Sequence, residues 1–273
     1  MPSNIVINQE LCTACGICAA VCPLNILRQE GKEKAEVVED SLRRCIACGH
    51  CEAYCPVNAI QAEYSGEYPL GPDLKTAFPD PAQLGHAMRS RRTCRVFKPD
   101  PVPRETVEEI LDVARYAPSG SNRQPVHWVI IQTPERMARI GGLAVERMRQ
   151  VVDSGQEHRY ARFFAGVIRA YEQGTNIILR NAPHLAVTAR VTDSAWSGTD
   201  ATIAMAWFEL AAQAHGVGTC WLGMLNMVED SEDLMQEIGI PEGYTFVYAM
   251  LFGKPAFKPR QIPKRNPSRV IWR

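Results

Sequence analysis

Eight of the ten cysteines in this chain of 273 residues lie between positions 12 and 55, and their spacing is regular. The pattern C-x-x-C-x-x-C-x-x-x-C-P occurs twice, as Cys12, Cys15, Cys18, Cys22 and Pro23 and again as Cys45, Cys48, Cys51, Cys55 and Pro56. Thiolates in such runs hold iron–sulfur clusters, and each cluster takes four of them. The spacing therefore predicts two iron–sulfur clusters near the start of the chain.

The two cysteine runs are copies of one small unit. Matched residues such as Cys12 and Cys45 are 33 positions apart, and Gly16 and Gly49 share this offset. A glycine after the middle cysteine lets the backbone approach a cluster, because it has no Cβ. The sequence thus contains an internal duplication.

Residues 1–62 resemble bacterial ferredoxins with two [4Fe–4S] clusters. In those proteins the fourth cysteine of each run ligates the other cluster. By this resemblance the first cluster is held by Cys12, Cys15, Cys18 and Cys55. The second cluster is held by Cys45, Cys48, Cys51 and Cys22.

Zinc and disulfide bonds are the alternative uses of these cysteines. Two C-x-x-C pairs alone would suit zinc, but two complete runs ending in Cys-Pro favour iron–sulfur clusters. Disulfide scaffolds belong to small secreted proteins, whereas these cysteines crowd one end of a long chain. Cys94 and Cys220 lie outside the runs, and for them a redox role and a buried structural role both remain open.

The second part of the chain contains three polar segments that could bind an anion. Residues 91–97 (RRTCRVF) combine three arginines with a hydroxyl, a set that can bind phosphate through forked hydrogen bonds. Residues 117–125 (APSGSNRQP) form a polar loop, and Lys258 and Arg260 lie near the C-terminus. Taken singly, these segments are equally typical of a solvated basic face, a capped turn and a basic tail.

In combination, and in this order, the segments resemble the nitroreductase family of FMN enzymes. The resemblance covers residues 82–273 and includes residues 117–128 (APSGSNRQPVHW), 216–223 (GVGTCWLG) and the K-x-R at 258–260. It implies an α+β sandwich that forms a homodimer, with one FMN at each end of the subunit interface.

The same resemblance assigns cofactor-binding roles to particular residues. Contacts to the FMN phosphate and ribityl chain fall to Arg91, Arg92, Thr93, Arg95, Lys258 and Arg260. Contacts to the isoalloxazine ring or its edge fall to Pro118, Ser119, Gly120, Asn122 and Gln124, the first three from the partner subunit. Leu222 and Gly223 are expected to approach the ring with backbone amides. Some family members have an acidic residue where Leu222 stands, so its side chain is not expected to touch the flavin.

The elements that would position these residues alternate between helix and strand. Apolar periodicity predicts helices over 104–116, most of 134–174 and 200–215, and strands over 126–132, 184–190 and 244–252. Residues 63–80 are rich in Gly, Pro and Tyr and are read as a linker. The expected organisation is a ferredoxin-like domain at 1–62, a linker at 63–80 and an FMN domain with an α+β fold at 81–273.

Composition limits the partners and the location. The formal net charge is zero, which supports neither nucleic acid nor an anionic membrane as a partner. No apolar run reaches the roughly 18 residues of a membrane-spanning helix, and no export signal is evident, so a cytoplasmic protein is expected. A G-x-G-x-x-G fingerprint is also missing, so no Rossmann-type nucleotide site is expected.

The two parts together predict an iron–sulfur flavoprotein oxidoreductase. Electrons would pass from the clusters to FMN and on to an electron-poor small molecule of the nitroaromatic, quinone or enone type. A low-potential electron-donor protein would feed the clusters. Alternatives are an electron-transfer or redox-sensing protein without a substrate of its own, and a specialised reductase of a dehydro- or halogenated metabolite. No catalytic side chain is assigned.

Overall fold

The structure is a computed structural model that describes residues 4–63, 79–194 and 196–273. It divides into two compact units. The first comprises Met1–Phe78 together with Gly120–Arg123, and the second comprises Pro79–Ser119 and Gln124–Arg273. The predicted linker at 63–80 falls almost wholly outside the described residues, and the predicted domain boundaries remain predictions.

The first unit is built from very short elements. Strand β1 (Ile5–Ile7) pairs antiparallel with β4 (Ile60–Ala62), and β2 (Leu27–Arg28) pairs antiparallel with β3 (Glu36–Val37). The remaining elements are α1 (Ile17–Val21), the 3₁₀ turn η1 (Leu42–Arg44) and α2 (His50–Ala53). Its small apolar core includes Ile5, Ile26, Leu27 and Ile60.

The sequence duplication is also a duplication of backbone conformation. Gly16 and Gly49 both have positive φ, at 75° and 71°, and each precedes a short helix that contains the third cysteine of its run. Asn25 and Asn58, which follow the two runs, share a φ of 50°. Glycine and asparagine adopt this left-handed conformation at low cost, so both runs can wrap tightly around a cluster.

The second unit is organised around a four-stranded antiparallel sheet. Its strands are β5 (His127–Ile131), β6 (His184–Val191), β8 (Tyr244–Gly253) and β7 (Gly218–Trp221), in that spatial order. Strands β6 and β8 pair along their whole length and form the centre, and β5 and β7 lie at the edges.

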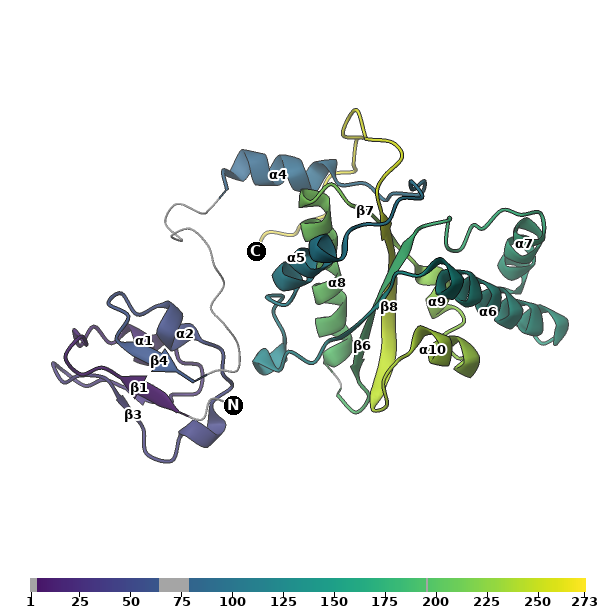
Figure 1. Cartoon of the computed structure of the whole chain (residues 1–273). Coiled ribbons are helices and arrows are strands. Elements are labelled where there is room, and N and C mark those ends of the chain that lie inside the picture. The colour runs from purple at the N-terminus through teal and green to yellow at the C-terminus, as the bar shows by residue number, and fades with distance from the viewer. Residues whose placement is uncertain (1–3, 64–78, 195) are drawn as a thin grey trace. The chain divides into compact units, whose positions relative to one another are not determined.

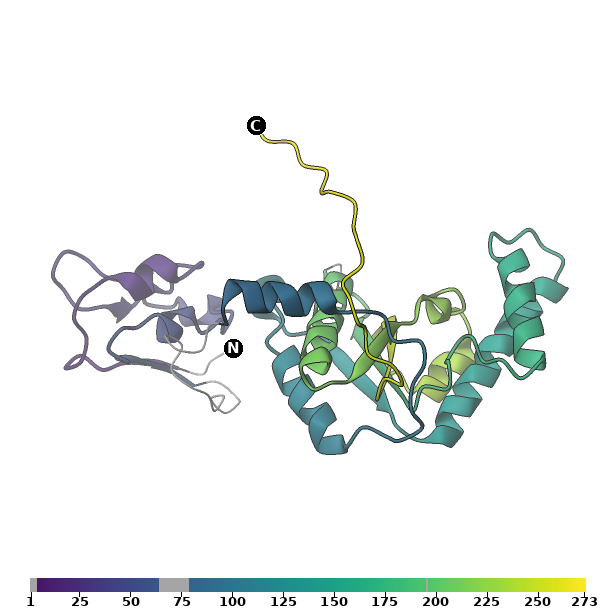
Figure 2. The same ribbon diagram turned by 90° about the horizontal axis from the view of Figure 1, so that it is seen from above.

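Alternating side chains of the sheet enter two separate cores. Leu185 and Val187 pack with the helices α6 (Pro134–Asp153), α7 (Ala161–Glu172), α9 (Gly223–Asn226) and α10 (Glu232–Ile238). Ala186, between them in sequence, packs with α5 (Arg104–Ala114) and α8 (Ser197–Ala214). Figures 1 and 2 show the two helix groups on opposite faces of the sheet. Strands buried on both faces explain why these segments are almost uniformly apolar.

The predicted α+β fold is confirmed, with boundaries that differ by a few residues. Helix α8 begins at Ser197, before the predicted start at residue 200, and α5 ends at Ala114 rather than at residue 116. Strand β7 was not predicted, since its short GTCW sequence has no alternating pattern. It forms because it pairs with β8, so tertiary context decides its conformation. Helix α4 (Pro81–Ser90) was also missed, although Asp80 caps its first turn.

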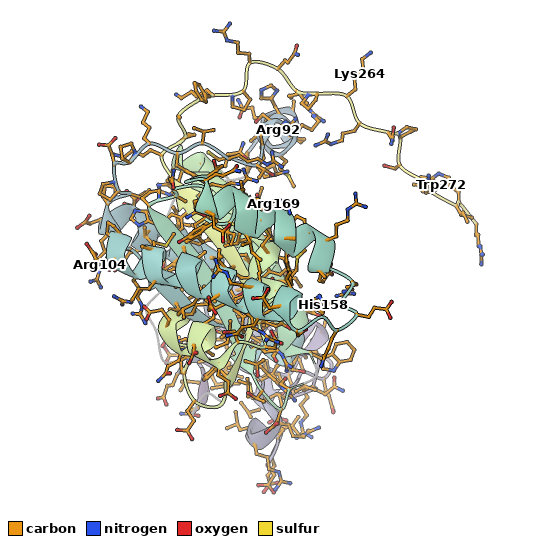
Figure 3. The ribbon with its side chains drawn as sticks, turned by 90° about the vertical axis from the view of Figure 1, so that its right-hand side faces the viewer. Arg92, Arg104, His158, Arg169, Lys264 and Trp272 are labelled. Atoms are coloured by element: carbon orange, nitrogen blue, oxygen red, sulfur yellow. The ribbon has the colours of Figure 1, made fainter. Side chains whose placement is uncertain are left out.

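The chain after β8 has no helix or strand. Its exposed C-terminal segment, with Lys264 and Trp272, extends away from the helices in Figure 3. Within the described residues, no helix is both long and apolar enough to cross a bilayer.

His184, at the start of β6, is the most deeply buried histidine of the second unit. Only 1% of its surface is exposed, and its Nε2 accepts the backbone N–H of Val102 at 2.8 Å. Its ring lies 4.9 Å from that of Phe252. Burial lowers the pKa of His184 from 6.5 to about 4, so the imidazole is neutral in the folded protein at neutral pH.

This histidine makes folding sensitive to mild acid. Between pH 6.5 and 4 the unfolded chain binds a proton that folded His184 excludes, so the free energy of unfolding falls as the pH falls. From pH 7 to pH 5 the expected loss from this group is about 2 kcal/mol. Glutamine can still accept the Val102 N–H but does not titrate. In urea unfolding followed by near-UV circular dichroism, His184→Gln should lose less stability over this range, and an equal loss in both proteins would contradict the assignment.

Candidate functional site

A cavity in the first unit is lined by four cysteines from both runs. These are Cys12, Cys15, Cys18 and Cys55, with Gly16, Ile17, Ala59 and Ile60 among the other lining residues. The fourth cysteine comes from the second run, and Cys22 is not part of this lining. This set is the one expected when the two runs exchange their last cysteine.

Backbone amides point at the sulfur atoms of the last cysteine of each run. Ile26 donates its N–H to Cys22 Sγ at 3.2 Å, and Ala59 donates its N–H to Cys55 Sγ at 3.1 Å. The two bonds occupy equivalent positions in the duplicated unit. Amide donors stabilise negative charge on a ligand sulfur and raise the reduction potential of a bound cluster, so these two bonds would act on the two clusters in the same direction.

The thiols differ in how readily they lose a proton. Burial raises the pKa of Cys51 to about 11 and also raises that of Cys18. Backbone N–H groups of Ala14 and Ala35 lower the pKa of Cys12. Because iron binds thiolates, cluster assembly must release protons from Cys18 and Cys51, whose pKa values are raised.

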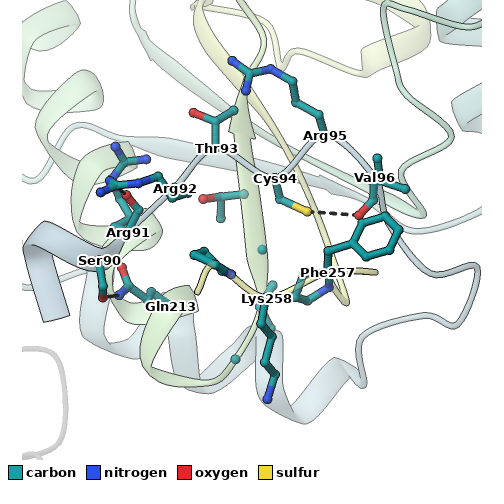
Figure 4. A pocket seen from close by; sticks show the side chains of 16 residues that line it. Ser90, Arg91, Arg92, Thr93, Cys94, Arg95, Val96, Gln213, Phe257 and Lys258 are labelled. Carbon is teal, nitrogen blue, oxygen red and sulfur yellow. Dashed lines mark hydrogen bonds between the residues drawn. The ribbon is translucent and has the colours of Figure 1, made fainter. Parts of the chain in front are cut away.

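The second unit contains a larger pocket of about 640 Å³, within the usual range for a small-molecule site. Three segments line it: Ser90 to Val96, the end of α8 with the start of β7, and the chain from Pro255 to Pro259. Figure 4 shows Gln213 beside Ser90, on the same side of the pocket as Arg91 and Arg92, whereas Lys258 comes from the C-terminal segment and its amine points away from the arginines.

Backbone pairing with β7 holds the first segment in place. Thr93 forms a parallel bridge with Thr219, and the Cys94 N–H donates to the Thr219 carbonyl at 2.7 Å. Gly218 permits this approach, because a Cβ there would lie 2.8 Å from the Cβ of Cys94. The arginine-rich segment therefore extends the edge of the sheet.

A second set of backbone bonds brings the C-terminal segment to the pocket. The Ala256 backbone N–H donates to the Val96 carbonyl at 3.0 Å, and the Lys98 backbone N–H donates to the Lys254 carbonyl at 2.8 Å. Phe97 and Pro255 form the bridge between these bonds. Lys258 follows directly and lines the pocket.

The pocket is basic and has polar atoms without partners. Its lining includes Arg91, Arg92, Arg95 and Lys258 and no acidic residue among the described residues. Arg92 Nε and Gln213 Oε1 are buried, and neither has a hydrogen-bond partner in the described part of the chain. Beneath the lining, Glu209 pairs with Arg91 at 3.1 Å. A ligand with an anionic group and further polar atoms would fit this lining.

Five of the predicted flavin-binding residues meet at this pocket. They are Arg91, Arg92, Thr93, Arg95 and Lys258. Arg260 is exposed and does not belong to the lining, whereas its neighbour Pro259 does. The roles of all these residues remain predictions.

The expectation for the Leu222 amide needs correction. Its N–H donates to the Ala249 carbonyl at 2.9 Å, so that group is used within the sheet region and is not available to a flavin ring. Gly223 opens α9, where the first N–H groups of a helix have no acceptor within the helix. Gly223 thus keeps the predicted role that Leu222 loses.

The predicted ring-contact loop is not part of this pocket. Ser119 Oγ accepts the N–H of Gln124 at 3.0 Å, and Ser121 and Gln124 have positive φ values of 54° and 48°. Asn122 is grouped with the first unit, where its side-chain amide donates to the Ala47 carbonyl at 2.7 Å. Pro118 and Gly120 do not line the pocket either, and the loop's role toward a partner subunit's flavin remains a prediction.

Two residues of this region were not assigned a role from the sequence. Gln213 lines the pocket, and Glu209 lies just beneath it. Both interrupt the otherwise apolar segment at 200–215, and this was the available signal. Cys94 and Cys220 lie close by, and burial raises the pKa of both thiols, as expected for protonated structural cysteines.

Comparison with known proteins identifies both units. Residues 88–254 match the profile of the nitroreductase family, and residues 4–56 match that of a 4Fe-4S dicluster domain. The nitroreductase NfnB of Mycolicibacterium smegmatis is 30% identical over 212 residues, which are 66% of this chain and 87% of that protein.

Solved structures agree with the fold of the second unit. A Bacteroides fragilis nitroreductase with bound FMN superposes with a TM-score of 0.57 at 18% identity, covering 69% of this chain and 99% of that one. NfnB from Mycobacterium smegmatis in complex with NADPH superposes with a TM-score of 0.54 at 24% identity. The match covers 71% of this chain and 100% of that one. The two profile matches confirm the predicted combination of a 4Fe-4S dicluster domain and a nitroreductase-like fold, and the predicted domain bounds stay a prediction.

Paired serine substitutions test the exchange of ligands between the two cysteine runs. If Cys55 belongs with Cys18, then Cys18→Ser/Cys55→Ser damages one cluster, whereas Cys18→Ser/Cys22→Ser damages both. Iron and sulfide analysis of anaerobically purified protein should therefore show one cluster in the first variant and none in the second. Cys220→Ser is the control and should retain both. The reverse order for the two double variants would show that each run ligates its own cluster.

Proposed function

This chain belongs to the nitroreductase family, and on that premise we propose that it is an iron–sulfur flavoprotein that passes electrons from two [4Fe–4S] clusters to FMN and on to an electron-poor small organic molecule. The observation that carries the proposal is the presence, in one chain, of a cysteine-lined cavity and of a basic pocket on a nitroreductase fold.

The basic pocket suits the phosphate end of FMN. Arg92, Arg95 and Lys258 supply positive charge, and the Thr93 hydroxyl adds a neutral donor. The unpartnered Arg92 Nε would gain an acceptor from such a ligand. The Bacteroides fragilis relative contains bound FMN, which is consistent with this assignment.

The two kinds of cofactor complement each other chemically. Each cluster transfers one electron at a time, so two clusters can supply the two electrons of a hydride. Bound FMN accepts single electrons and can deliver a hydride. The protein's own contribution is to hold the cofactors, to tune the clusters through the N–H groups of Ile26 and Ala59, and to neutralise the phosphate.

Two kinds of electron donor fit this arrangement. NADPH is a second candidate donor, because the Mycobacterium smegmatis relative was solved in complex with it. We favour a low-potential donor protein, since the clusters are the natural entry point for single electrons. Nitroaromatic compounds, quinones and enones are the proposed acceptors. A carrier without its own substrate, and a reductase of dehydro- or halogenated metabolites, are the alternatives.

A homodimer is part of the proposed arrangement. Helix α8 leaves Trp207 and Leu210 each 39% exposed, and Val113 and Tyr116, in and just after α5, are 45% and 49% exposed. Large exposed apolar side chains on adjacent helices are typical of subunit interfaces. A second copy of the chain would cover them and, by family resemblance, would bring residues 118–124 toward the flavin.

Removing one phosphate contact should weaken FMN binding selectively. Lys258→Ala is expected to raise the dissociation constant of FMN about tenfold, because a charge-assisted hydrogen bond is lost. Riboflavin lacks the phosphate, so its affinity should not change. Lys98→Ala removes an exposed lysine outside the pocket and serves as the control. Fluorescence titration of flavin-free protein measures both constants, and an equal effect on FMN and riboflavin would place the phosphate elsewhere.

Removing the clusters should interrupt the supply of electrons to the flavin. We compare wild-type protein with Cys18→Ser/Cys22→Ser, using anaerobic stopped-flow absorbance. A reduced ferredoxin should reduce the flavin of wild-type protein at least about tenfold faster than that of the cluster-free variant, because single electrons enter through the clusters. Rapid flavin reduction by NADPH in the cluster-free variant would contradict this route.

The same instrument identifies the acceptor class. Reduced protein is mixed with a nitroarene, a quinone, an enone or a halogenated phenol, and the flavin and cluster bands are followed as they reoxidise. Reoxidation by one class identifies the substrate chemistry. Stable reduction in the presence of all four would favour the electron-carrier alternative.

A further inference from the structure

Glu209, in the second half of α8, is a buried carboxylate that accepts three hydrogen bonds. Its Oε1 accepts from Arg91 Nη1 at 3.1 Å and from Thr219 Oγ1 at 3.2 Å, and its Oε2 accepts from Trp221 Nε1 at 3.1 Å. Glu209 is 8% exposed. One side chain thus joins α8, strand β7 and the arginine-rich segment that lines the pocket.

Burial makes these bonds necessary for the stability of the carboxylate. A carboxylate removed from water is stable only when it is paired and its oxygens are hydrogen-bonded. Glu209 meets both conditions, because Arg91 supplies the charge and Thr219 and Trp221 supply neutral donors. Trp221 is itself held at its ring by Tyr248, with ring centroids 4.9 Å apart.

The pairing defines what Arg91 can contribute to the pocket. Its guanidinium is held at Nη1 by Glu209 Oε1, and its side chain retains 28% exposure at the pocket wall. The charges of Arg91 and Glu209 cancel, so Arg91 presents oriented N–H donors rather than net charge. A side chain that is ordered before the ligand arrives loses less conformational entropy on binding.

We propose that Glu209 is a positioning residue for FMN, which orients Arg91 toward the phosphate end of the cofactor and fixes β7 beside it. This inference rests on the proposed assignment of the basic pocket to FMN. Two simpler roles compete with it. In the first, Glu209 would act only as a counter-charge that weakens phosphate binding. In the second, it would only stabilise the fold.

Preference for FMN over riboflavin separates these three roles. In Glu209→Gln the side chain has one acceptor oxygen and one NH₂ group. Whichever way the amide is turned, its NH₂ group faces the N–H of either Trp221 or Arg91, and two donors cannot bond to each other. Because the glutamine cannot satisfy all three donors, Arg91 should be held less firmly, and the ratio of riboflavin to FMN dissociation constants should fall about tenfold. A pure counter-charge role predicts that the ratio rises, and a pure stability role predicts that both ligands are affected equally.

Rescue by a second substitution makes the test specific to geometry. In Glu209→Gln/Trp221→Phe the indole donor is absent, so the glutamine oxygen can again accept from Arg91 and Thr219 while its NH₂ faces no donor. The ratio should return to that of Trp221→Phe alone, which is expected to be two- to threefold below wild type. Glu108→Gln, which removes the charge of an exposed carboxylate paired with Arg104, should leave the ratio unchanged.

The measurements use the full chain with its clusters, freed of flavin and titrated by fluorescence, with circular dichroism to verify folding. A rise in the ratio, an unchanged ratio, or a failure of rescue would overturn the inference. If Glu209→Gln does not fold, Trp221→Phe alone decides, and an unchanged ratio overturns the inference. Wild-type protein that does not distinguish FMN from riboflavin would instead overturn the proposed phosphate site, whatever the variants show.

Discussion

The hydrogen bond from the Cys94 amide to the Thr219 carbonyl, 2.7 Å long, is the interaction on which the pocket of the second unit depends. It attaches the arginine-rich segment to β7, the edge strand of the sheet. Gly218 leaves room for this approach, and Glu209 fastens the same two segments from below through Arg91 and Thr219. Phosphate-binding charges on a flexible segment would cost conformational entropy at every binding event. Backbone pairing with a sheet edge removes most of that cost before the ligand arrives.

The first unit solves a different problem, since it has little apolar core and must hold eight thiolates at two points. Its backbone enters the left-handed region at equivalent positions in both runs, as at Gly16 and Gly49. Strands of two or three residues cannot supply much stability on their own. In small metal-binding domains the free energy of metal binding is itself free energy of folding. The clusters are therefore expected to act as structural as well as electronic groups.

The charge that the pocket of the second unit presents depends on which of its cations are paired with carboxylates. The whole chain has a formal net charge of zero, yet the pocket gathers four cations, and none of the described residues in its lining is acidic. Glu209 neutralises one of them from beneath, which leaves directed donors and a smaller net charge facing the ligand. This arrangement explains how a basic pocket can exist in a protein whose formal net charge is zero. In the proposed FMN site it would also separate the charge that attracts the phosphate from the donors that orient it.

The sequence alone determined the cluster unit and the family, because cysteine spacing is a local property and both cluster runs repeat it. It also predicted most of the sheet and the helices α5 and α8, whose apolar periodicity is local as well. Only the tertiary structure decided that β7 is a strand, that the Leu222 amide is used by Ala249, and that Glu209 holds Arg91. These features join residues far apart in the chain, such as Arg91 and Glu209. No local pattern encodes such pairs, since each partner alone reads as an ordinary polar residue and acquires its role only when the sheet brings the segments together.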